Sequence, residues 1–497
     1  MSSQVAGEGE APFRVFFIPF FVPSHMIPMT KLACEFAARG VDSTVVVTPA
    51  NDAIIRPFVD QAARTGHPVH ILHYPFPSSV VGLPEGVESL ATVHPAEEGK
   101  IYQAVDAVQG EHGRILREHC PDAVVADVPY WWTTDVAREL GIPRVTFFPM
   151  GAFPLTVMNR LNSHRPFGGL ADGDNRPFLV PGLPDPVEMV KSELPNFLRF
   201  HDQLTENWDR IKKANLECFG GVVNTFYELE TKYCDQFRHE ESRDVFYVGP
   251  LSKWLRGEVA DKKAAAKGAE CMAWLDKQAA ASVAYVAFGS YGHFSKQQHW
   301  EMARGLEASG RPFLWALKER VSGSGGADWL PEGFEERVRG RGLVVRGWLP
   351  QEAILNHRAT GAFVTHLGWN STLEGLASGL PMITWPLAFE QFINERLVVK
   401  ILRVGVRMWE GPRSSVAEEA AQLLVTADAI ARVVSRFAAP GEADAEVEAM
   451  RKRARKYTLL ARAAVSDGGS SWKDIDRLID ALKTFRLNGG EKDQMRP

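Results

Sequence analysis

Two stretches of the chain alternate short apolar runs with amphipathic segments of helical period. This alternation is typical of parallel sheets covered by helices. In the first stretch it predicts strands at 13–19, 43–48, 122–126 and 144–148, and helices at 29–39 and 133–140. In the second it predicts strands at 282–288, 312–317, 343–348, 361–366 and 382–385, helices at 295–307 and 351–357, and a further helix that begins near Asn370.

A change of composition separates the two stretches. Residues 251–270 are rich in Lys, Ala and Gly and show no apolar period, which predicts a linker. We therefore expect an α/β protein with two doubly wound, Rossmann-like domains, 1–250 and 271–470, facing each other across a cleft. A helix within 471–497 is expected to pack back on the first domain before a short tail. In this architecture ligands bind in the crevice at the carboxyl ends of the strands.

The composition is that of an ordinary globular protein. Hydrophobic residues make up 45% and charged residues 24% of the 497 positions. The formal net charge of −5 does not indicate the basic surface that binds a nucleic acid, so we expect no such partner. The basic run at 451–456 is interpreted as a solvated helix face. Nothing in the pattern predicts an oligomer, and we expect a monomer.

The cysteines and the N-terminal segment indicate in which cellular compartment we expect the protein. The five cysteines are scattered and never form a C-x-x-C pair, which favours a reducing compartment over a disulfide framework or a structural zinc site. Residues 1–12 lack the layout of a signal peptide. The apolar stretch 13–29 is interrupted by Pro19, Pro23 and Pro28, so it is too broken to span a bilayer. We expect a cytoplasmic protein without a membrane span.

The most specific stretch covers residues 348–391 and reads WLPQEAILNHRATGAFVTHLGWNSTLEGLASGLPMITWPLAFEQ. A strand delivers His366 into a turn that begins a helix. Gly368 allows close approach of the backbone, and Asn370 and Ser371 are residue types that cap helices. The free N–H groups at such a helix start favour an anionic ligand such as phosphate.

Two further residues of this stretch extend the site from a phosphate to a nucleotide. Glu374 lies one turn after Asn370 on the same side of the helix, where it can accept hydrogen bonds from sugar hydroxyls. Trp348, at a strand end, could stack on a base, a contact worth about 1–3 kcal/mol. Singly, each residue has an ordinary structural interpretation, such as a core tryptophan, a turn glycine or a helix cap. Their order and spacing together favour a nucleoside diphosphate site.

This stretch resembles the signature of the plant secondary-product glycosyltransferases within the family 1 UDP-glycosyltransferases. It has the W-x-P-Q opening, the H-x-G-W-N-S core, the following glutamate, the G-x-P step and the closing E-Q. The segments S-H-M-I-P-M at 24–29, A-F-G-S at 287–290 and G-G-S-S-W at 468–472 are also similar to the family. The resemblance covers about residues 13–486. It implies the GT-B fold, with an acceptor-binding domain at 1–250 and a UDP-sugar-binding domain at 271–470.

The resemblance also implies roles for residues of the motif. Trp348 would stack on uracil, Gln351 would lie beside uracil and ribose, and Glu374 would bind the ribose hydroxyls. The diphosphate would be held by the turn at Gly368 together with Ser290, His366, Asn370 and Ser371. The transferred sugar would contact Trp369, Glu390 and Gln391. A glutamine at position 391 is similar to glucose users of the family, whereas galactose users often have a histidine there. Xylose, rhamnose, galactose and glucuronic acid stay open as alternatives.

Transfer to a hydroxyl needs a base, and His25 follows the first strand at the predicted cleft. Histidine ionises near neutral pH and works better as a base when a carboxylate orients its ring. Asp127 follows strand 122–126 at the same edge, whereas Asp122 begins that strand and Asp135 falls on the next helix. A lone histidine is more often structural, but the family uses such a His–Asp pair, and S-H-M-I-P and V-A-D-V-P match its positions.

The implied reaction is an inverting displacement at the anomeric carbon, with a UDP-sugar as co-substrate and no other cofactor. No D-x-D motif stands near the donor site, so we expect no obligatory metal, with the helix start and His366 supplying positive potential. Met150 departs from the Ser or Thr that family members often carry there. A catalytically inactive UDP-sugar-binding protein remains an alternative.

The acceptor is expected to be small, apolar and hydroxylated, such as a flavonoid, terpenoid or other phenolic. Aromatic residues gather at 130–132, 147–153 and 197–200. They either line a pocket for such an acceptor or belong to the core.

Overall fold

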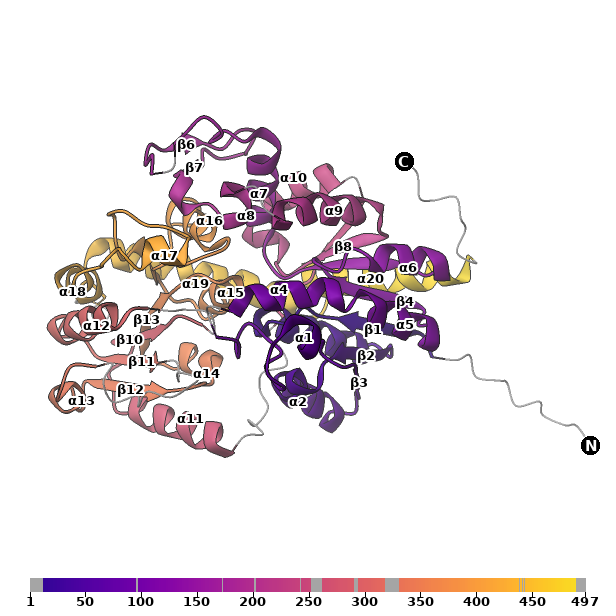
Figure 1. The fold of residues 1–497 in the computed structure, drawn as a ribbon. Coiled ribbons are helices and arrows are strands. Elements are labelled where there is room, and N and C mark those ends of the chain that lie inside the picture. The colour runs from indigo at the N-terminus through magenta and orange to yellow at the C-terminus, as the bar shows by residue number, and fades with distance from the viewer. Residues whose placement is uncertain are drawn as a thin grey trace, which may run out of the picture.

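The computed structural model describes residues 12–94, 97–171, 173–200, 203–241, 243–251, 262–289, 294–317, 330–437, 439, 441 and 443–488. Within these residues two parallel β-sheets are flanked by helices and lie on opposite sides of the molecule (Figure 1). This arrangement confirms the two doubly wound domains that the sequence predicts.

The N-terminal domain contains a seven-stranded parallel sheet in the order β3-β2-β1-β4-β5-β8-β9. Its strands are β1 (Arg14–Ile18), β2 (Asp42–Val47), β3 (His70–His73), β4 (Ala123–Asp127), β5 (Arg144–Phe148), β8 (Gly220–Val223) and β9 (Asp244–Tyr247). A small hairpin, β6 (Phe178–Leu179) and β7 (Glu188–Met189), lies outside it. The strand order reverses between β1 and β4, which makes the crevice between their carboxyl ends the expected ligand position.

Helices of the N-terminal domain cover both faces of this sheet (Figure 1). They are α1 (Pro23–Ala37), α2 (Pro49–Arg64), α3 (Ser78–Val81), α4 (Glu98–Ala107), α5 (Gln109–His119), α6 (Thr133–Leu140), α7 (Ala152–His164), α8 (Asn196–Arg199), α9 (Gln203–Glu217) and α10 (Thr231–Glu241), with 3₁₀ turns η2 (Lys191–Glu193) and η3 (Tyr227–Leu229).

The C-terminal domain contains a six-stranded parallel sheet in the order β12-β11-β10-β13-β14-β15. Its strands are β10 (Val283–Ala287), β11 (Phe313–Leu317), β12 (Gly342–Arg346), β13 (Thr360–Thr365), β14 (Met382–Thr384) and β15 (Gly405–Arg407). Its helices are α11 (Lys262–Leu275), α12 (Lys296–Ala308), α13 (Phe334–Arg337), α14 (Gln351–Leu355), α15 (Trp369–Ala377), α16 (Gln391–Glu395), the π-helix η6 (Arg396–Ile401), α17 (Ala417–Ala420), α18 (Ala427–Ser435) and α19 (Ala445–Val465). Here the strand order reverses between β10 and β13.

Two predicted boundaries are wrong. The helix after β1 begins at Pro23 rather than at 29, because proline at the first helical position is compatible with a helix and Pro28 is accommodated inside it. His25 therefore lies in the first turn of a helix and not in a loop. Helix α11 begins at Lys262, inside the segment predicted as a linker, and residues 252–261 lie outside the described residues.

The apolar core continues from one domain into the other. The largest cluster of buried side chains combines residues of the N-terminal domain, such as Phe153 and Phe226, with residues of the C-terminal domain, such as Trp369, Leu373 and Phe392. Burial of apolar area stabilises by about 25 cal/mol per Å². A shared core of this kind therefore holds the two domains in a defined relative position.

Buried charges cross the same boundary. Glu193, on η2 of the N-terminal domain, forms ion pairs with Arg396 and Arg413 of the C-terminal domain. The fully buried carboxylate of Glu395 contacts these two arginines and Arg407. Removal of one partner would leave an uncompensated buried charge, which costs about 3–5 kcal/mol in comparable networks. The segment around η2 is thus tied to the C-terminal domain.

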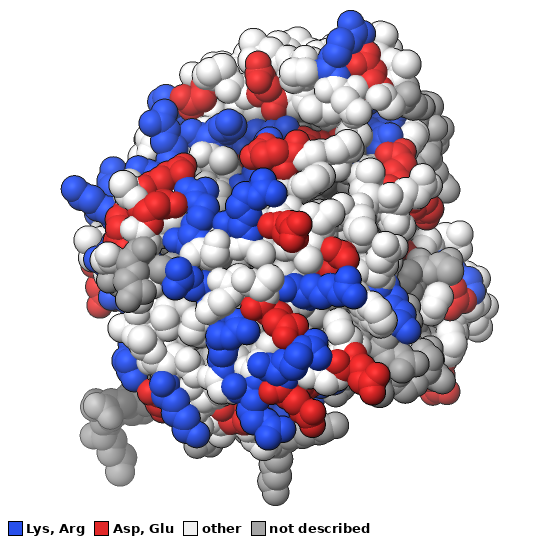
Figure 2. Space-filling view, turned by 90° about the vertical axis from the view of Figure 1, so that its left-hand side faces the viewer, with Lys and Arg blue, Asp and Glu red and all other residues white. Residues whose placement is uncertain are grey.

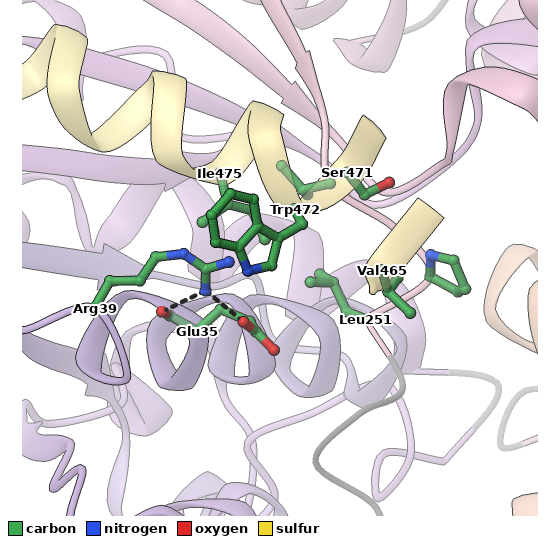
Figure 3. Close-up of a pocket in the computed structure, with 9 residues that line it drawn as sticks. Glu35, Arg39, Leu251, Val465, Ser471, Trp472 and Ile475 are labelled. Atoms are coloured by element: carbon green, nitrogen blue, oxygen red, sulfur yellow. Dashed lines mark hydrogen bonds and ion pairs between the residues drawn. The ribbon is translucent and has the colours of Figure 1, made fainter. Parts of the chain in front are cut away.

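The last helix, α20 (Ser470–Leu487), returns to the N-terminal domain (yellow in Figure 1). Its Ile475, Leu478, Ile479 and Leu482 join the core cluster of β1, β2 and α1. Figure 3 shows how the start of the helix docks: Arg39, in the turn after α1, points toward the indole of Trp472, and the guanidinium carbon lies 5.5 Å from the ring centroid. Arg39 also contacts Glu35 and donates from Nε to Asp476 over 2.7 Å. Glu35, Arg39 and Trp472 line a small pocket at this contact, and none of the predicted site residues lines it.

Charges of both signs are interspersed on the face that carries α12, α13 and α18 (Figure 2). Arg337 pairs with Glu307, and Arg436 pairs with Asp444. None of the helices in the described parts of the chain combines the length and apolar character needed to cross a bilayer.

We predict that Leu478→Ala lowers the stability of the protein by about 2–5 kcal/mol, because it opens a cavity in the core of the N-terminal domain. Leu478 is fully buried there, in the same core cluster as residues of α1 and α2, although more than 400 positions separate them along the chain. The measurement is the midpoint of thermal unfolding. Asp480→Ala, at an exposed position of the same helix, is the control and should leave the midpoint unchanged. Equal midpoints for both variants would contradict the docking of α20.

Candidate active site

The predicted base and its carboxylate lie together at the point where the first sheet reverses its order. Ile18, the last residue of β1, pairs with Ala126, so the segments that follow β1 and β4 begin at the same level. Nδ1 of His25 lies 3.0 Å from Oδ1 and 3.0 Å from Oδ2 of Asp127. Because the carboxylate only accepts, Nδ1 carries the proton and the lone pair of Nε2 is left to act as a base.

Asp127 is held rigidly in this position. Its side chain is fully buried, and it also accepts hydrogen bonds from the backbone N–H groups of Phe20 (3.1 Å) and Val128 (2.8 Å). The other two candidates lie elsewhere: Asp122 accepts from the N–H of Arg14, the first residue of β1, and Asp135 pairs with Arg138 on α6. The His25 side chain is 22% exposed, so it can reach a ligand while its orientation is fixed.

The second sheet presents a phosphate-sized turn at its own reversal point. Ala287 of β10 pairs with Thr365 of β13, which brings Gly289 against the ring of His366. Leu367 has a positive φ of 64°, and its N–H donates to Thr365 Oγ1 while its carbonyl accepts from Asn394 Nδ2. Such strained residues cluster at ligand-binding sites. Ser290, predicted to join this turn, lies outside the described residues.

Helix α15 begins directly after the turn, with Gly368 at the N-cap position. The prediction that Asn370 and Ser371 are caps is therefore wrong, because both are inside the helix. The first intrahelical bond runs from the N–H of Thr372 to the carbonyl of Gly368. The N–H groups of residues 369–371 thus point out of the helix start, where they favour an anion.

His366 does not supply the positive charge that the sequence suggests. Burial lowers the pKa of its imidazole to about 4, so the ring is neutral at neutral pH. Its Nδ1 is buried without a partner among the described residues. A neutral imidazole can still donate one hydrogen bond to a phosphate oxygen. Positive potential at this turn comes from the start of α15.

Three motif residues form a connected polar group beside this helix. Gln351 Nε2 donates to Glu374 Oε2 over 2.7 Å and to Ser371 Oγ over 3.1 Å. Burial raises the pKa of the Glu374 carboxyl, and Lys31 of the other domain opposes this rise. Trp348 is 59% exposed, which is unusual for tryptophan and leaves a flat face for a base.

Glu390 and Gln391, the last residues of the motif, extend the site toward His25. Burial raises the pKa of the Glu390 carboxyl, whereas hydrogen bonds to its own backbone N–H and to Asn394 and the charge of His25 oppose this rise. The oxygen of Gln391 accepts from the N–H groups of Leu387 (2.9 Å) and Ala388 (3.1 Å). Only its amide nitrogen is left for a ligand.

The two domains are joined by hydrogen bonds at this site. Trp369 Nε1 donates to the carbonyl of Asn224 over 2.6 Å, and Asn224 Nδ2 donates to Asn370 Oδ1 over 3.2 Å. Asn370 Nδ2 donates to the carbonyl of Ser24 over 2.8 Å. The indole N–H of Trp369 is therefore occupied, and a sugar could form a hydrogen bond with this residue only through its backbone.

Sequence reasoning missed the partners on the N-terminal side, which are Ser24, Asn224 and Gly151. The indole of Trp369 lies on Gly151, where an added Cβ would come within 2.3 Å of the ring. One signal was present for Ser24: Pro28, four positions later, has no N–H and leaves the Ser24 carbonyl without its helical partner.

The aromatic segments at 130–132, 147–153 and 197–200, for which the sequence allowed either a pocket or the core, belong mainly to the core. Tyr130, Trp132, Phe147 and Phe153 are almost completely buried. Met150 is half-buried and packs against the largest core cluster, so the position offers no side-chain hydroxyl. Phe20 was not predicted; its ring lies 5.4 Å from that of His25 in an edge-on contact.

Comparison with known proteins agrees with this geometry. Residues 251–414 match the family model described as UDP-glucoronosyl and UDP-glucosyl transferase. The scopoletin glucosyltransferase of Nicotiana tabacum is 36% identical, with 95% of this chain and 98% of the relative covered. The chain belongs to the plant UDP-glycosyltransferase family. The anthocyanin 3'-O-beta-glucosyltransferase of Gentiana triflora is 37% identical over 96% of this chain and 99% of the relative.

Solved structures confirm the GT-B fold of this glycosyltransferase. A Glycyrrhiza uralensis protein complexed with glycyrrhetinic acid 3-O-monoglucuronide is similar with a TM-score of 0.87 and 35% identity, and 98% of each chain is covered. A Phytolacca americana protein complexed with UDP-2fluoro-glucose and pterostilbene has a TM-score of 0.76 and 26% identity, over 95% of this chain and all of that one. The protein is a UDP-dependent glycosyltransferase, with a UDP-sugar as co-substrate.

We predict that Gly151→Ala lowers kcat/KM by about a hundredfold, because the new methyl group displaces Trp369 and with it the start of α15, and shifts of about 1 Å can have this effect. Gly99→Ala, at a helical glycine with nothing within 4 Å of the added Cβ, is the control. Steady-state kinetics on both variants is the measurement. Wild-type kcat/KM in Gly151→Ala would contradict the role of this contact.

Proposed function

We propose that the protein transfers glucose from UDP-glucose to a hydroxyl of a small apolar acceptor, with inversion at the anomeric carbon. The observation that carries the proposal is the pair His25–Asp127, at 3.0 Å, next to Ser24, whose carbonyl accepts from Asn370 at the start of α15. Names of the relatives, which include a scopoletin and an anthocyanin glucosyltransferase, support the donor and the class of acceptor.

In the proposed reaction Nε2 of His25 removes the proton of the acceptor hydroxyl as its oxygen attacks the anomeric carbon. The bond from that carbon to the UDP oxygen breaks on the opposite face, and UDP leaves with the electron pair. Asp127 stabilises the imidazolium that forms. The edge-on ring of Phe20 restricts His25 on one side, so the base approaches the acceptor in a fixed orientation.

The leaving UDP is stabilised by groups that do not have to reorganise. The N–H groups of residues 369–371 and the neutral ring of His366 can donate to the diphosphate. No group of three or more His, Cys, Asp or Glu side chains among the described residues is arranged to hold a metal ion. We propose that these donors suffice and that the reaction has no obligatory metal.

The sugar is proposed to lie between the start of α15 and the pair Glu390–Gln391. Glu390 can only accept hydrogen bonds while it is ionised, whereas the amide nitrogen of Gln391 donates. Glucose and galactose differ only in the orientation of the 4-hydroxyl. Discrimination between them requires a polar group that pairs with one orientation and is left unpaired by the other.

We predict that His25→Ala lowers kcat by about 10²–10⁴-fold, because a general base is lost, and leaves the affinity for UDP unchanged. Turnover with UDP-glucose and calorimetry with UDP are the measurements. His70→Ala is the matched control, because His70 also faces an aspartate, Asp42 at 3.5 Å, but on an exposed edge. If His25→Ala retains more than about a tenth of kcat, the general-base assignment is wrong.

We predict that Gln391→His shifts the ratio of kcat/KM toward UDP-galactose and lowers the overall rate, because the bonds to Leu387 and Ala388 lose their carboxamide oxygen. Gln391→Glu is the matched variant, since it keeps an oxygen for both N–H groups and removes only the donor to the sugar. Kinetics with both donors and one acceptor tests this. An unchanged ratio in both variants would place sugar selection elsewhere.

A further inference from the structure

A buried cation of the N-terminal domain lies within range of carboxylates of the C-terminal domain. Lys31 lies on α1 and is 5% exposed. Its ammonium lies 5.4 Å from the ring centroid of Phe58 on α2. It forms no hydrogen bond, and no ion pair within 4.0 Å, with any residue that the structure describes. An ammonium that is removed from water without such partners is costly, which indicates that a ligand completes its surroundings.

Lys31 is placed opposite Glu374 by the two helices that carry them. Helices α1 and α15 meet at their starts, where Asn370 Nδ2 bonds to the carbonyl of Ser24 over 2.8 Å. Glu374 follows Asn370 by one turn of α15, and Lys31 follows Ser24 by two turns of α1. Carboxylates of Glu374 and Glu352 are the charges that act on the Lys31 ammonium from the C-terminal domain.

One of the two carboxylate oxygens of Glu374 accepts no hydrogen bond from the described residues. Oε2 accepts from Gln351 Nε2, whereas no described group donates to Oε1. The Lys31 ammonium and Oε1 of Glu374, each without a hydrogen bond from the described residues, thus interact across the domain boundary from farther apart than an ion pair. A hydroxyl group fits between them, because its lone pairs accept from an ammonium while its proton is donated to a carboxylate. A ribose, with two adjacent hydroxyls, offers this group twice.

We propose that Lys31 binds the ribose of the nucleotide together with Glu374, so that the diol is held between the two domains. The proposal deepens the proposed function and rests on it. Its consequence is that the donor site is complete only when α1 lies against α15. The nucleotide then adds its own hydrogen bonds to the contacts that join the two domains.

The test compares UDP with 2'-deoxy-UDP, which lacks one of the two hydroxyls. Calorimetry gives the affinities of both nucleotides for the wild type, Lys31→Met, Lys31→Arg and Lys213→Met. Lys213 is a matched control, because its side chain is 79% exposed on α9. Methionine keeps the length and apolar stem of lysine and removes only the ammonium.

We expect the wild type to prefer UDP over 2'-deoxy-UDP. Lys31→Met should weaken the binding of UDP by about ten- to a hundredfold, because a charge-assisted hydrogen bond is lost, and should reduce the preference for UDP. Lys31→Arg should retain part of both, and Lys213→Met should match the wild type. The unfolding midpoint of Lys31→Met should not fall, since a buried unpaired charge is removed.

Other outcomes overturn the proposal. Unchanged affinities in Lys31→Met would show that Lys31 does not contact the nucleotide. An equal loss for both nucleotides would show that Lys31 does not act through the 2'-hydroxyl, so that the diol is not held as proposed, or that it acts through folding if the unfolding midpoint also falls. If the wild type itself binds neither nucleotide, the proposed function fails. If the wild type binds UDP but Lys31 contributes nothing to the affinity, only the proposal about Lys31 fails.

Discussion

The hydrogen bond from Asn370 to the carbonyl of Ser24 is the contact on which the active site depends. It joins the starts of α1 and α15, the helices that carry the proposed base and that follow the proposed phosphate-binding turn. An ordinary helix would use the Ser24 carbonyl internally, but Pro28 has no N–H to donate to it. A proline that weakens α1 as a helix thus provides the acceptor that the other domain needs.

The domains meet in a defined way because several kinds of interaction cross the same boundary. Trp369 lies against Gly151 and donates to Asn224, and apolar residues of both domains share one core. Glu193 forms ion pairs with arginines of the C-terminal domain. The bonds from Trp369 and Asn370 position the donor turn relative to His25, while the ion pairs hold the segment around η2. Catalysis needs such positioning, since the base and the donor site belong to different sheets.

Burial decides the charge state of the groups around the proposed nucleotide. It lowers the pKa of His366 and raises those of Glu374 and Glu390. A neutral imidazole and a helix start can both donate to a diphosphate without carrying a full charge. Burial also lowers the pKa of Lys31 of the opposite domain, and the carboxylates of Glu374 and Glu352 oppose this fall. The electrostatics of the site are therefore a property of the assembled cleft rather than of the motif alone.

The sequence by itself determined the two-domain fold and the succession of strands and helices along the chain. It also determined the candidate site residues, which are His25, Asp127 and those of the motif at 348–391. Apolar period and motif spacing are local properties, and parallel strands bring their carboxyl ends to one edge by topology. Only the tertiary structure decided that His366 is neutral and that Trp369 contacts Gly151 and Asn224. Those properties depend on burial and on contacts between residues more than a hundred positions apart, and no local pattern of residues encodes them.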